Sequence, residues 1–367
     1  MLIGIDASRA AKKQRTGVEE YTYQVISRLA RQDRENQYIL YTDQPLPAEL
    51  KKKLPENWRV KVIPLFRFWT QYRLPQELRR DRPDVVWFPA SAMPIGYHGK
   101  KVATIHGLEF EYFPDAYGWR QRWYLRWSTG YALRRASRII AVSNNTKQDL
   151  IKKYHAGTNR ITVVPNGYSY YQPSPDMKPL LEKFGLSPQQ FFIFTGRLER
   201  RKNIKRLISA YENLRRQTDW TGRLVLAGKF GLGREEIEAA ARQSVFNKDI
   251  VFPGYQQKAD LSTLVQQASA LVFPSLYEGF GLPILEAFAL GTPVVCSRTA
   301  SLPEVGGPGA IYVDPESVES ISRGLRLVLE ESREKRAALR RQQLQKFSWD
   351  ICAKGIRNVL VESARGN

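Results

Sequence analysis

Two glutamates and a short glycine loop stand close together in the second half of the chain. The segment Ser275–Val295 reads SLYEGFGLPILEAFALGTPVV and carries Glu278 and Glu286, separated by seven residues. A strand-like run leads into the loop Glu278–Gly281, and an apolar helix is expected near Pro283, where the missing N–H costs nothing. A helix entrance binds anions because its first backbone N–H groups have no partner within the helix. We therefore expect an anionic ligand at this loop, with two carboxylates beside it.

A basic pair follows another predicted strand, Phe191–Gly196. Arg197 and Lys202 stand five residues apart just beyond the strand, so a planar guanidinium and a compact ammonium group could converge on one diphosphate. Arg200 and Arg201 lie between them, and a run of charges is usually only a solvated surface. Taken alone, this pair is a weak indication of a phosphate site.

Two positions in the first half of the chain also fit a ligand site. His106 ends the run KVATIH and precedes a glycine, and ligands of open α/β sheets bind beyond the carboxyl ends of strands. A lone histidine is more often structural, so His106 decides nothing by itself. Gly17 precedes the predicted helix Val18–Arg31, for which Thr16 and Glu19 form a capping box. A backbone could approach a phosphate at Gly17, but a capped surface helix explains this glycine equally well.

Short apolar strands alternate with helical stretches along the whole chain, which predicts an α/β fold with parallel sheets built from right-handed crossovers. Two such series suggest two doubly wound domains that face one another across a cleft. We place their boundary in Asn166–Pro175, where Gly, Ser and Pro cluster. The predicted strands are Leu2–Ala7, Gln37–Thr42, Arg59–Leu65, Asp84–Pro89, Val102–His106, Arg138–Ser143, Arg160–Pro165, Phe191–Gly196, Arg223–Gly228, Asp249–Pro253, Ala270–Ser275, Pro293–Ser297 and Ala310–Asp314.

Bulk properties narrow the class of protein. A chain of 367 residues exceeds what one core usually serves, and a net charge of +21 attracts polyanions such as nucleic acid, anionic membranes or phosphate-bearing substrates. Cys296 and Cys352 lack metal-binding spacing and suit a reducing compartment. We see no leader segment and no apolar run of membrane-spanning length, so we expect a cytoplasmic protein that at most lies on a membrane.

One helical stretch, Trp119–Arg138, combines aromatic and basic residues. Trp119, Trp123 and Trp127 share one face, with arginines interleaved. We expect this aromatic stripe to be buried in the first domain with the arginines solvated. The alternative is a helix whose aromatic and arginine side chains meet lipid head groups or the acceptor.

Together these segments resemble the retaining glycosyltransferases of family 4, which have the GT-B fold of two facing Rossmann-like domains. The resemblance runs nearly end to end. It is carried by RTGVEEY, TIHGLEF, RIIAVSNNTKQDL, VVPNG, TGRLERRKN, the segment with the two glutamates, LPEVGG and FSWD, in the order of the family. The segment with the two glutamates is the most specific of these. The resemblance implies an acceptor domain over residues 1–170 and a donor domain over residues 171–345. It also implies a last helix, about 351–362, that crosses back to the first domain.

The resemblance also implies transfer of a sugar from a nucleotide diphosphate with retention of configuration and without a metal or other cofactor. Arg197 and Lys202 resemble the basic pair that neutralises the leaving diphosphate, beside Gly196 in the donor site. Glu278 resembles the carboxylate that binds donor-sugar hydroxyls. Glu286, which is expected in the first helical turn, resembles the carboxylate that binds the ribose. The amides expected to meet the donor sugar and its β-phosphate are those of Phe280, Gly281 and Leu282.

The remaining implied contacts come from other loops. Gly17 would let the first domain close over the phosphates, and His106 would meet the donor sugar near the reacting carbon. Gly254 and Tyr255 are expected near the nucleobase. Many relatives have an aspartate where this chain has Gly107, which leaves the contact of that aspartate in doubt.

Several alternatives stand beside this interpretation. Two carboxylates suggest a glycoside hydrolase, but both lie on one loop and helix, whereas hydrolase carboxylates flank the bond. We assign no side-chain general base, because such transferases are thought to use the leaving phosphate. An epimerase of the same fold would need acid and base residues that we do not find. Nucleic-acid binding rests on charge alone, with no recognised module. We favour GDP-mannose slightly over UDP-sugars, and a glycan or lipid-linked acceptor in bacterial surface polysaccharide assembly, at an anionic membrane surface.

Overall fold

The structure, a computed structural model, describes residues 1–12, 15, 17–64 and 69–366. The described chain divides into two compact units, one formed by Met1–Gly167 with Phe347–Asn367 and the other by Tyr168–Lys346. The proposed capping residue Thr16 and the end of the expected strand at residue 65 lie outside the described residues.

Unit 1 contains a seven-stranded parallel sheet in the order β3-β2-β1-β4-β5-β6-β7. This is a doubly wound order, in which successive connections run outward in opposite directions from the centre between β1 and β4. Its strands are β1 (Leu2–Asp6), β2 (Gln37–Thr42), β3 (Trp58–Val62), β4 (Val85–Phe88), β5 (Lys101–Ile105), β6 (Arg138–Ala141) and β7 (Ile161–Val163).

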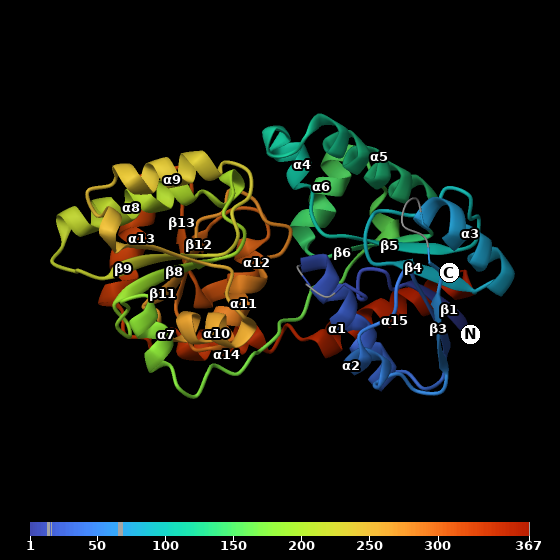
Figure 1. The fold of residues 1–367 in the computed structure, drawn as a ribbon. Coiled ribbons are helices and arrows are strands. Elements are labelled where there is room, and N and C mark those ends of the chain that lie inside the picture. Colours follow the sequence, from blue (N-terminus) through green and yellow to red (C-terminus); the bar gives the residue numbers. More distant parts are fainter. Residues whose placement is uncertain (13–14, 16, 65–68, 367) are drawn as a thin grey trace. The chain divides into compact units, whose positions relative to one another are not determined.

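Helices cover both faces of this sheet, with α1 and α15 on one face and α5 and α6 on the other (Figure 1). The last helix therefore belongs to unit 1, and α15 packs on α1 and on β4, β5 and β6. The helices of unit 1 are α1 (Gly17–Gln32), α2 (Ala48–Lys51), α3 (Trp69–Asp81), α4 (Glu109–Tyr112), α5 (Trp119–Arg135), α6 (Asn144–Tyr154) and α15 (Trp349–Arg365), with 3-10 turns at Pro114–Ala116 and Thr158–Arg160.

Unit 2 repeats the architecture with a six-stranded parallel sheet in the order β10-β9-β8-β11-β12-β13. Its strands β8 and β11 are buried along their whole length, as expected for strands covered on both faces. The strands are β8 (Phe191–Thr195), β9 (Arg223–Ala227), β10 (Ile250–Gly254), β11 (Ala270–Phe273), β12 (Val294–Ser297) and β13 (Ile311–Val313).

Figure 1 shows α8 and α13 on one face of the second sheet and α10, α11 and α14 on the other. The helices of unit 2 are α7 (Lys178–Lys183), α8 (Ile204–Gln217), α9 (Arg234–Gln243), α10 (Lys258–Gln267), α11 (Leu282–Ala289), α12 (Leu302–Gly306), α13 (Val318–Glu330) and α14 (Ala337–Leu344), with 3-10 turns at Arg200–Lys202, Asn247–Asp249 and Gly307–Gly309. Every expected strand overlaps an observed one, so the predicted α/β class with two parallel sheets is confirmed.

The expected burial of the aromatic stripe on α5 is wrong. Trp119 is 75% exposed and Trp123 is 64% exposed, whereas the buried residues of α5 include Ser128, Ala132 and Leu133. The helix packs through small residues, which allow close approach to the sheet, and the large rings therefore point away from the core. No helix of the described chain is long and apolar enough to span a bilayer.

Candidate functional site

The basic segment and the glutamate loop meet at the centre of the second sheet. Strands β8 and β11 are neighbours there, and their connections leave in opposite directions. The turn Arg200–Lys202 follows β8, and the loop that contains Glu278 follows β11. Ligands of doubly wound sheets bind at this point, beyond the carboxyl ends of the strands where the order reverses. The fold thus brings two segments that lie far apart in sequence to the expected ligand position.

Lys202 and Glu278 form a buried ion pair at this position. The Lys202 Nζ donates a hydrogen bond to Glu278 Oε1, and both side chains are about nine-tenths buried. Arg201 Nη1 lies 3.1 Å from Glu278 Oε2, so the carboxylate faces two cations. Burial acts to raise the pKa of Glu278, but Lys202 and Arg201 outweigh it and hold the pKa below its ordinary value. Glu278 is therefore ionised at neutral pH.

Arg201 is a site residue that the sequence did not single out. Its Nε lies 2.8 Å from Glu199 Oε1, and its Nη1 donates to the Tyr277 carbonyl oxygen at 3.2 Å. Arg201 is therefore not part of a solvated run of charges, whereas Arg200 is exposed and pairs with Glu236. Sequence reasoning had no signal to separate the two arginines, because the bend of the turn decides which one points inward.

The loop before α11 is held in a conformation that requires glycine. Gly281 has φ 114°, and a Cβ at this position would meet Leu302 Cδ2 at 2.8 Å. Behind the loop, the buried Ser301 Oγ lies 2.8 Å from the Glu278 carbonyl oxygen and 2.7 Å from that of Phe280. Ser301 was not predicted as a site residue, and it positions the loop from behind.

The predicted features of α11 are largely present. Leu282 and Pro283 are its first two residues, and Gly291, with φ 75°, follows its end. Glu286 is the fifth residue of α11 and half-buried, so it stands at the start of the second turn and not in the first as expected.

Four other predicted residues of unit 2 also lie at the carboxyl ends of strands. Gly196 follows β8 and Gly254 ends β10, both with positive φ. Arg197 is exposed, and among the residues that the structure describes it takes part in no ion pair. Tyr255 is also exposed, and Lys229 Nζ lies 5.0 Å from the centre of its ring. The structure thus pairs both Lys202 and Arg201 with Glu278, and Arg197 takes no part in this cluster.

In unit 1, His106 lies just beyond β5 and is fixed by its neighbours. Its Nε2 lies 2.7 Å from the Pro89 carbonyl oxygen, and its ring contacts the Tyr21 ring edge-on at 4.7 Å. A carbonyl oxygen only accepts hydrogen bonds, so Nε2 carries the proton and Nδ1 is left as an acceptor. Burial lowers the pKa of His106 to about 4, so the ring is neutral at pH 7 and could accept a bond from a ligand hydroxyl.

Asp6 is a third residue that sequence reasoning missed. It ends β1 next to the centre of the first sheet and is buried, and its Oδ1 accepts hydrogen bonds from the Ser8 backbone N–H and hydroxyl. Burial raises the pKa of its carboxyl group, which Ser8 and Arg9 partly oppose. An acidic residue at the last position of an otherwise apolar strand is the signal that could have found it. Gly17 opens α1, and a Cβ there would meet no atom within 4 Å.

The state of His106 gives a testable pH dependence. The unfolded chain protonates a histidine near its ordinary pKa of 6.5, while folded His106 stays neutral down to about pH 4. The stabilisation from this group is therefore complete above pH 6.5 and is lost as the pH falls from 6.5 to 4. His106→Gln should flatten the pH dependence of the free energy of unfolding over this range, measured by urea denaturation followed by tryptophan fluorescence.

Fluorescence suits this measurement, because every tryptophan except Trp220 lies in unit 1. The matched control is His98→Gln, which changes an exposed histidine of the same unit and should keep the wild-type slope. An unchanged slope in His106→Gln would show that His106 is not held neutral by the fold.

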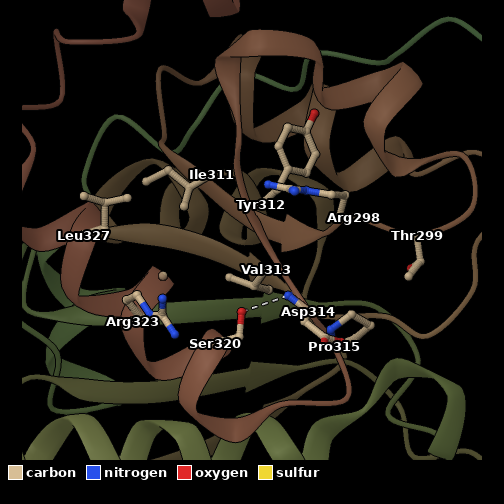
Figure 2. Close-up of a pocket in the computed structure, with 11 residues that line it drawn as sticks. Arg298, Thr299, Ile311, Tyr312, Val313, Asp314, Pro315, Ser320, Arg323 and Leu327 are labelled. Atoms are coloured by element: carbon tan, nitrogen blue, oxygen red, sulfur yellow. Dashed lines mark hydrogen bonds between the residues drawn. The ribbon is translucent and has the colours of Figure 1, made fainter.

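A cavity of about 470 Å³ lies in unit 2 beside the edge strand β13 (Figure 2). Ser320 on α13 accepts a hydrogen bond from the Asp314 backbone N–H across it, and Arg298 and Arg323 stand on its rim. Pro315 lines the cavity, and its carbonyl oxygen accepts a hydrogen bond from Nδ2 of Asn203. Asn203 directly follows Lys202 of the ion pair in the sequence. None of the residues predicted for the site lines it, so we do not assign it to the donor.

Comparisons with known proteins bear on the family and the fold of this chain. The model for glycosyl transferases group 1 matches residues 178–346, and the model for glycosyltransferase family 4 matches residues 15–170. The O-antigen chain mannosyltransferase B of Escherichia coli is 29% identical over 95% of this chain and 96% of its own length.

Solved structures are similar over the whole fold. A sucrose-phosphate synthase from Thermosynechococcus elongatus has a TM-score of 0.75 at 18% identity and covers 100% of both chains. The HepE protein of Anabaena, solved with UDP-glucose, has a TM-score of 0.75 at 17% identity and covers 98% of this chain and 99% of its own. At these identities the likeness concerns the fold alone.

Proposed function

We propose, from the premise that this chain belongs to the group 1 glycosyltransferases with the GT-B fold, that it is a retaining hexosyltransferase using a nucleotide-diphosphate sugar. The observation that carries the proposal is the buried pair of Lys202 and Glu278 above the centre of the second sheet. A buried pair is weak evidence for stability, because desolvation opposes it, so a role in ligand binding accounts better for its position.

The chemistry of the donor fits the groups at this position. Lys202 has three N–H donors, so it can keep its bond to Glu278 while it donates to a phosphate oxygen of the leaving diphosphate. Arg197, which is exposed and lies five residues earlier in the sequence, would add a planar fork to the same diphosphate. Positive charge placed where negative charge develops lowers the barrier to departure, and in this proposal the two side chains do so without a metal.

The two carboxylates bind and do not hydrolyse in this proposal. Glu278, ionised and fixed by Lys202 and Arg201, accepts hydrogen bonds from hydroxyls of the donor sugar. Glu286 accepts from the ribose, and the backbone at Phe280–Leu282 meets the sugar and its β-phosphate. The acceptor hydroxyl attacks from the face that the diphosphate leaves and passes its proton to the leaving phosphate, so configuration is kept.

The remaining donor contacts in this proposal come from two residues of unit 1 and two of unit 2. His106, a neutral ring with Nδ1 as acceptor, receives a bond from the donor sugar, and Gly17 lets the backbone approach the phosphates. Gly254 and Tyr255 contact the base. We assign no side chain as general base, since the leaving phosphate oxygen takes the proton.

We further propose that the donor is GDP-mannose and the acceptor a lipid-linked or anionic glycan of a bacterial surface polysaccharide. The similarity to the E. coli O-antigen chain mannosyltransferase B over nearly the whole of both chains supports the choice of mannose. The net charge of +21 favours an acceptor that carries phosphate or lies on an anionic membrane. We place the reaction in the cytoplasm, at the inner face of that membrane.

Thermal unfolding with a nucleotide panel tests the donor. At a ligand concentration of about 100 times Kd, GDP should stabilise the folded chain by about 2.7 kcal/mol. GDP and GDP-mannose should raise the melting temperature more than UDP or UDP-glucose, and Glu286→Gln should reduce the shift. No shift with any nucleoside diphosphate would contradict the donor proposal, and a larger shift with UDP would overturn the choice of base alone.

A further inference from the structure

The helix α5 presents large aromatic rings to solvent in one connected surface. Trp123 and Trp127 stack with ring centres 6.4 Å apart, and Trp127 and Tyr131 stack at 5.5 Å. Single exposed apolar residues are normal on a protein, but a contiguous patch of them marks an interaction site. We call this the α5 surface. Its exposed residues are Trp119, Trp123, Tyr124 and Ile95, and the half-buried rings of Trp127 and Tyr131 lie between them and the core.

The α5 surface is held in place at its far end by a neighbouring loop. The Tyr131 hydroxyl donates to the Ile95 carbonyl oxygen at 3.3 Å, and the Ile95 backbone N–H donates to Gln71 Oε1 at 3.0 Å. Gln71 belongs to α3, so two helices and a loop fix the position of Ile95, whose side chain is about half exposed. Rings on a rigid helix lose little conformational freedom when they bind.

Arginines surround these rings, and α5 contains no Asp or Glu. Two of its arginines are engaged within unit 1, since Arg126 pairs with Glu111 at 3.1 Å and Arg122 donates to the Phe110 carbonyl oxygen at 3.0 Å. Arg120, Arg134 and Arg135 are exposed along the helix. The acidic residues of the preceding segment are Glu109, Glu111 and Asp115. The charge of α5 itself is thus wholly positive.

The start of α5 lies at the carboxyl side of the first sheet, because α5 connects the end of β5 to the start of the parallel strand β6. Burial raises the pKa of Tyr124, and the positive charge of Arg9 opposes this shift. The same charge adds to burial in lowering the pKa of His106. Arg9 follows β1, so Tyr124 and His106 both lie within reach of the carboxyl ends of the first sheet.

We propose that the α5 surface docks on an anionic membrane, with Trp119 and Trp123 in the interfacial layer and Arg120, Arg134 and Arg135 against lipid phosphates. Indole rings favour this layer because they combine an apolar body with one N–H donor, and arginine binds phosphate with a planar fork. Recognition of a neutral glycan would also call for carboxylate acceptors, which α5 lacks. The inference rests on the proposed function and deepens it, since it names how a lipid-linked acceptor reaches unit 1.

Vesicle flotation of the full chain tests the inference without donor or acceptor. The probes are vesicles of phosphatidylcholine alone and vesicles that contain about one-third phosphatidylglycerol, at low and high salt. The wild-type chain should bind only the anionic vesicles and bind more weakly at high salt. Trp119→Ala with Trp123→Ala should weaken binding by at least about tenfold, and Arg120→Gln by about fivefold.

The matched control is Leu232→Ala with Val245→Ala, which removes two exposed apolar side chains from unit 2 and should leave vesicle binding unchanged. Circular dichroism and the thermal shift with GDP check that the tryptophan variant is folded and still binds nucleotide. No binding of the wild-type chain to anionic vesicles, equal binding by the tryptophan variant, or capture by neutral dextran in place of vesicles would overturn the inference. Nucleotide binding is read separately, so failure here is distinguishable from failure of the proposed function.

Discussion

Lys202→Ala should lower the rate of sugar transfer by about 10²- to 10³-fold, as expected when a preorganised donor to developing negative charge is removed. The side chain is buried beside Glu278 and does not lie on the solvated surface. Arg201 is already engaged with Glu199 and Glu278. The measurement is steady-state release of nucleoside diphosphate from the donor.

The matched control for this change is Arg200→Ala. Arg200 belongs to the same turn as Lys202 but is exposed and pairs with Glu236 on α9. An exposed pair of this kind contributes little, so this variant should keep its turnover within about twofold of the wild-type value. Lys202→Ala turnover within about tenfold of wild type, in a chain whose melting curve is intact, would contradict the phosphate assignment.

Replacing Glu278 with leucine should lower the free energy of unfolding by about 3 to 5 kcal/mol, because Lys202 would lose its carboxylate partner within a buried site. The double variant Lys202→Met with Glu278→Leu should recover most of this loss, since two apolar side chains of similar size avoid the cost of burying charges. Both variants should be inactive. Urea denaturation followed by circular dichroism measures the three free energies.

This cycle separates a ligand-binding role from a structural one. If the double variant is stable and inactive, the pair is present for the donor and not for the fold. A double variant as unstable as Glu278→Leu alone would mean that the pair stabilises unit 2 directly, and the site interpretation would lose its main observation.

The architecture followed from sequence because it depends on local patterns. Buried parallel strands such as Phe191–Thr195 are continuous apolar runs, and Gly291 marks the end of α11 by its position alone. The partners of Glu278 were harder to predict from the sequence. Both glutamates and Lys202 were recognised, but that Lys202 and Arg201 would face the same carboxylate depends on how the turn after β8 bends toward the loop after β11.

The aromatic helix shows why periodicity alone misplaces a face. Trp119, Trp123 and Trp127 recur at helical spacing, as a buried stripe would. Small residues such as Ser128 and Ala132 lie toward the core instead, and their packing against the sheet decides the orientation of α5. The spacing of apolar residues shows that a helix has two different faces. Which of the two packs on the sheet depends on the size of the side chains that fit there.

The most direct test of the central claim follows the anomeric proton of GDP-mannose by NMR during incubation with the wild-type chain and a mannoside acceptor. Our account predicts that GDP is released and that the mannosyl product first appears with the α configuration of the donor. A β-configured first product would contradict retention, and the absence of consumption of any GDP- or UDP-sugar would contradict the transferase itself.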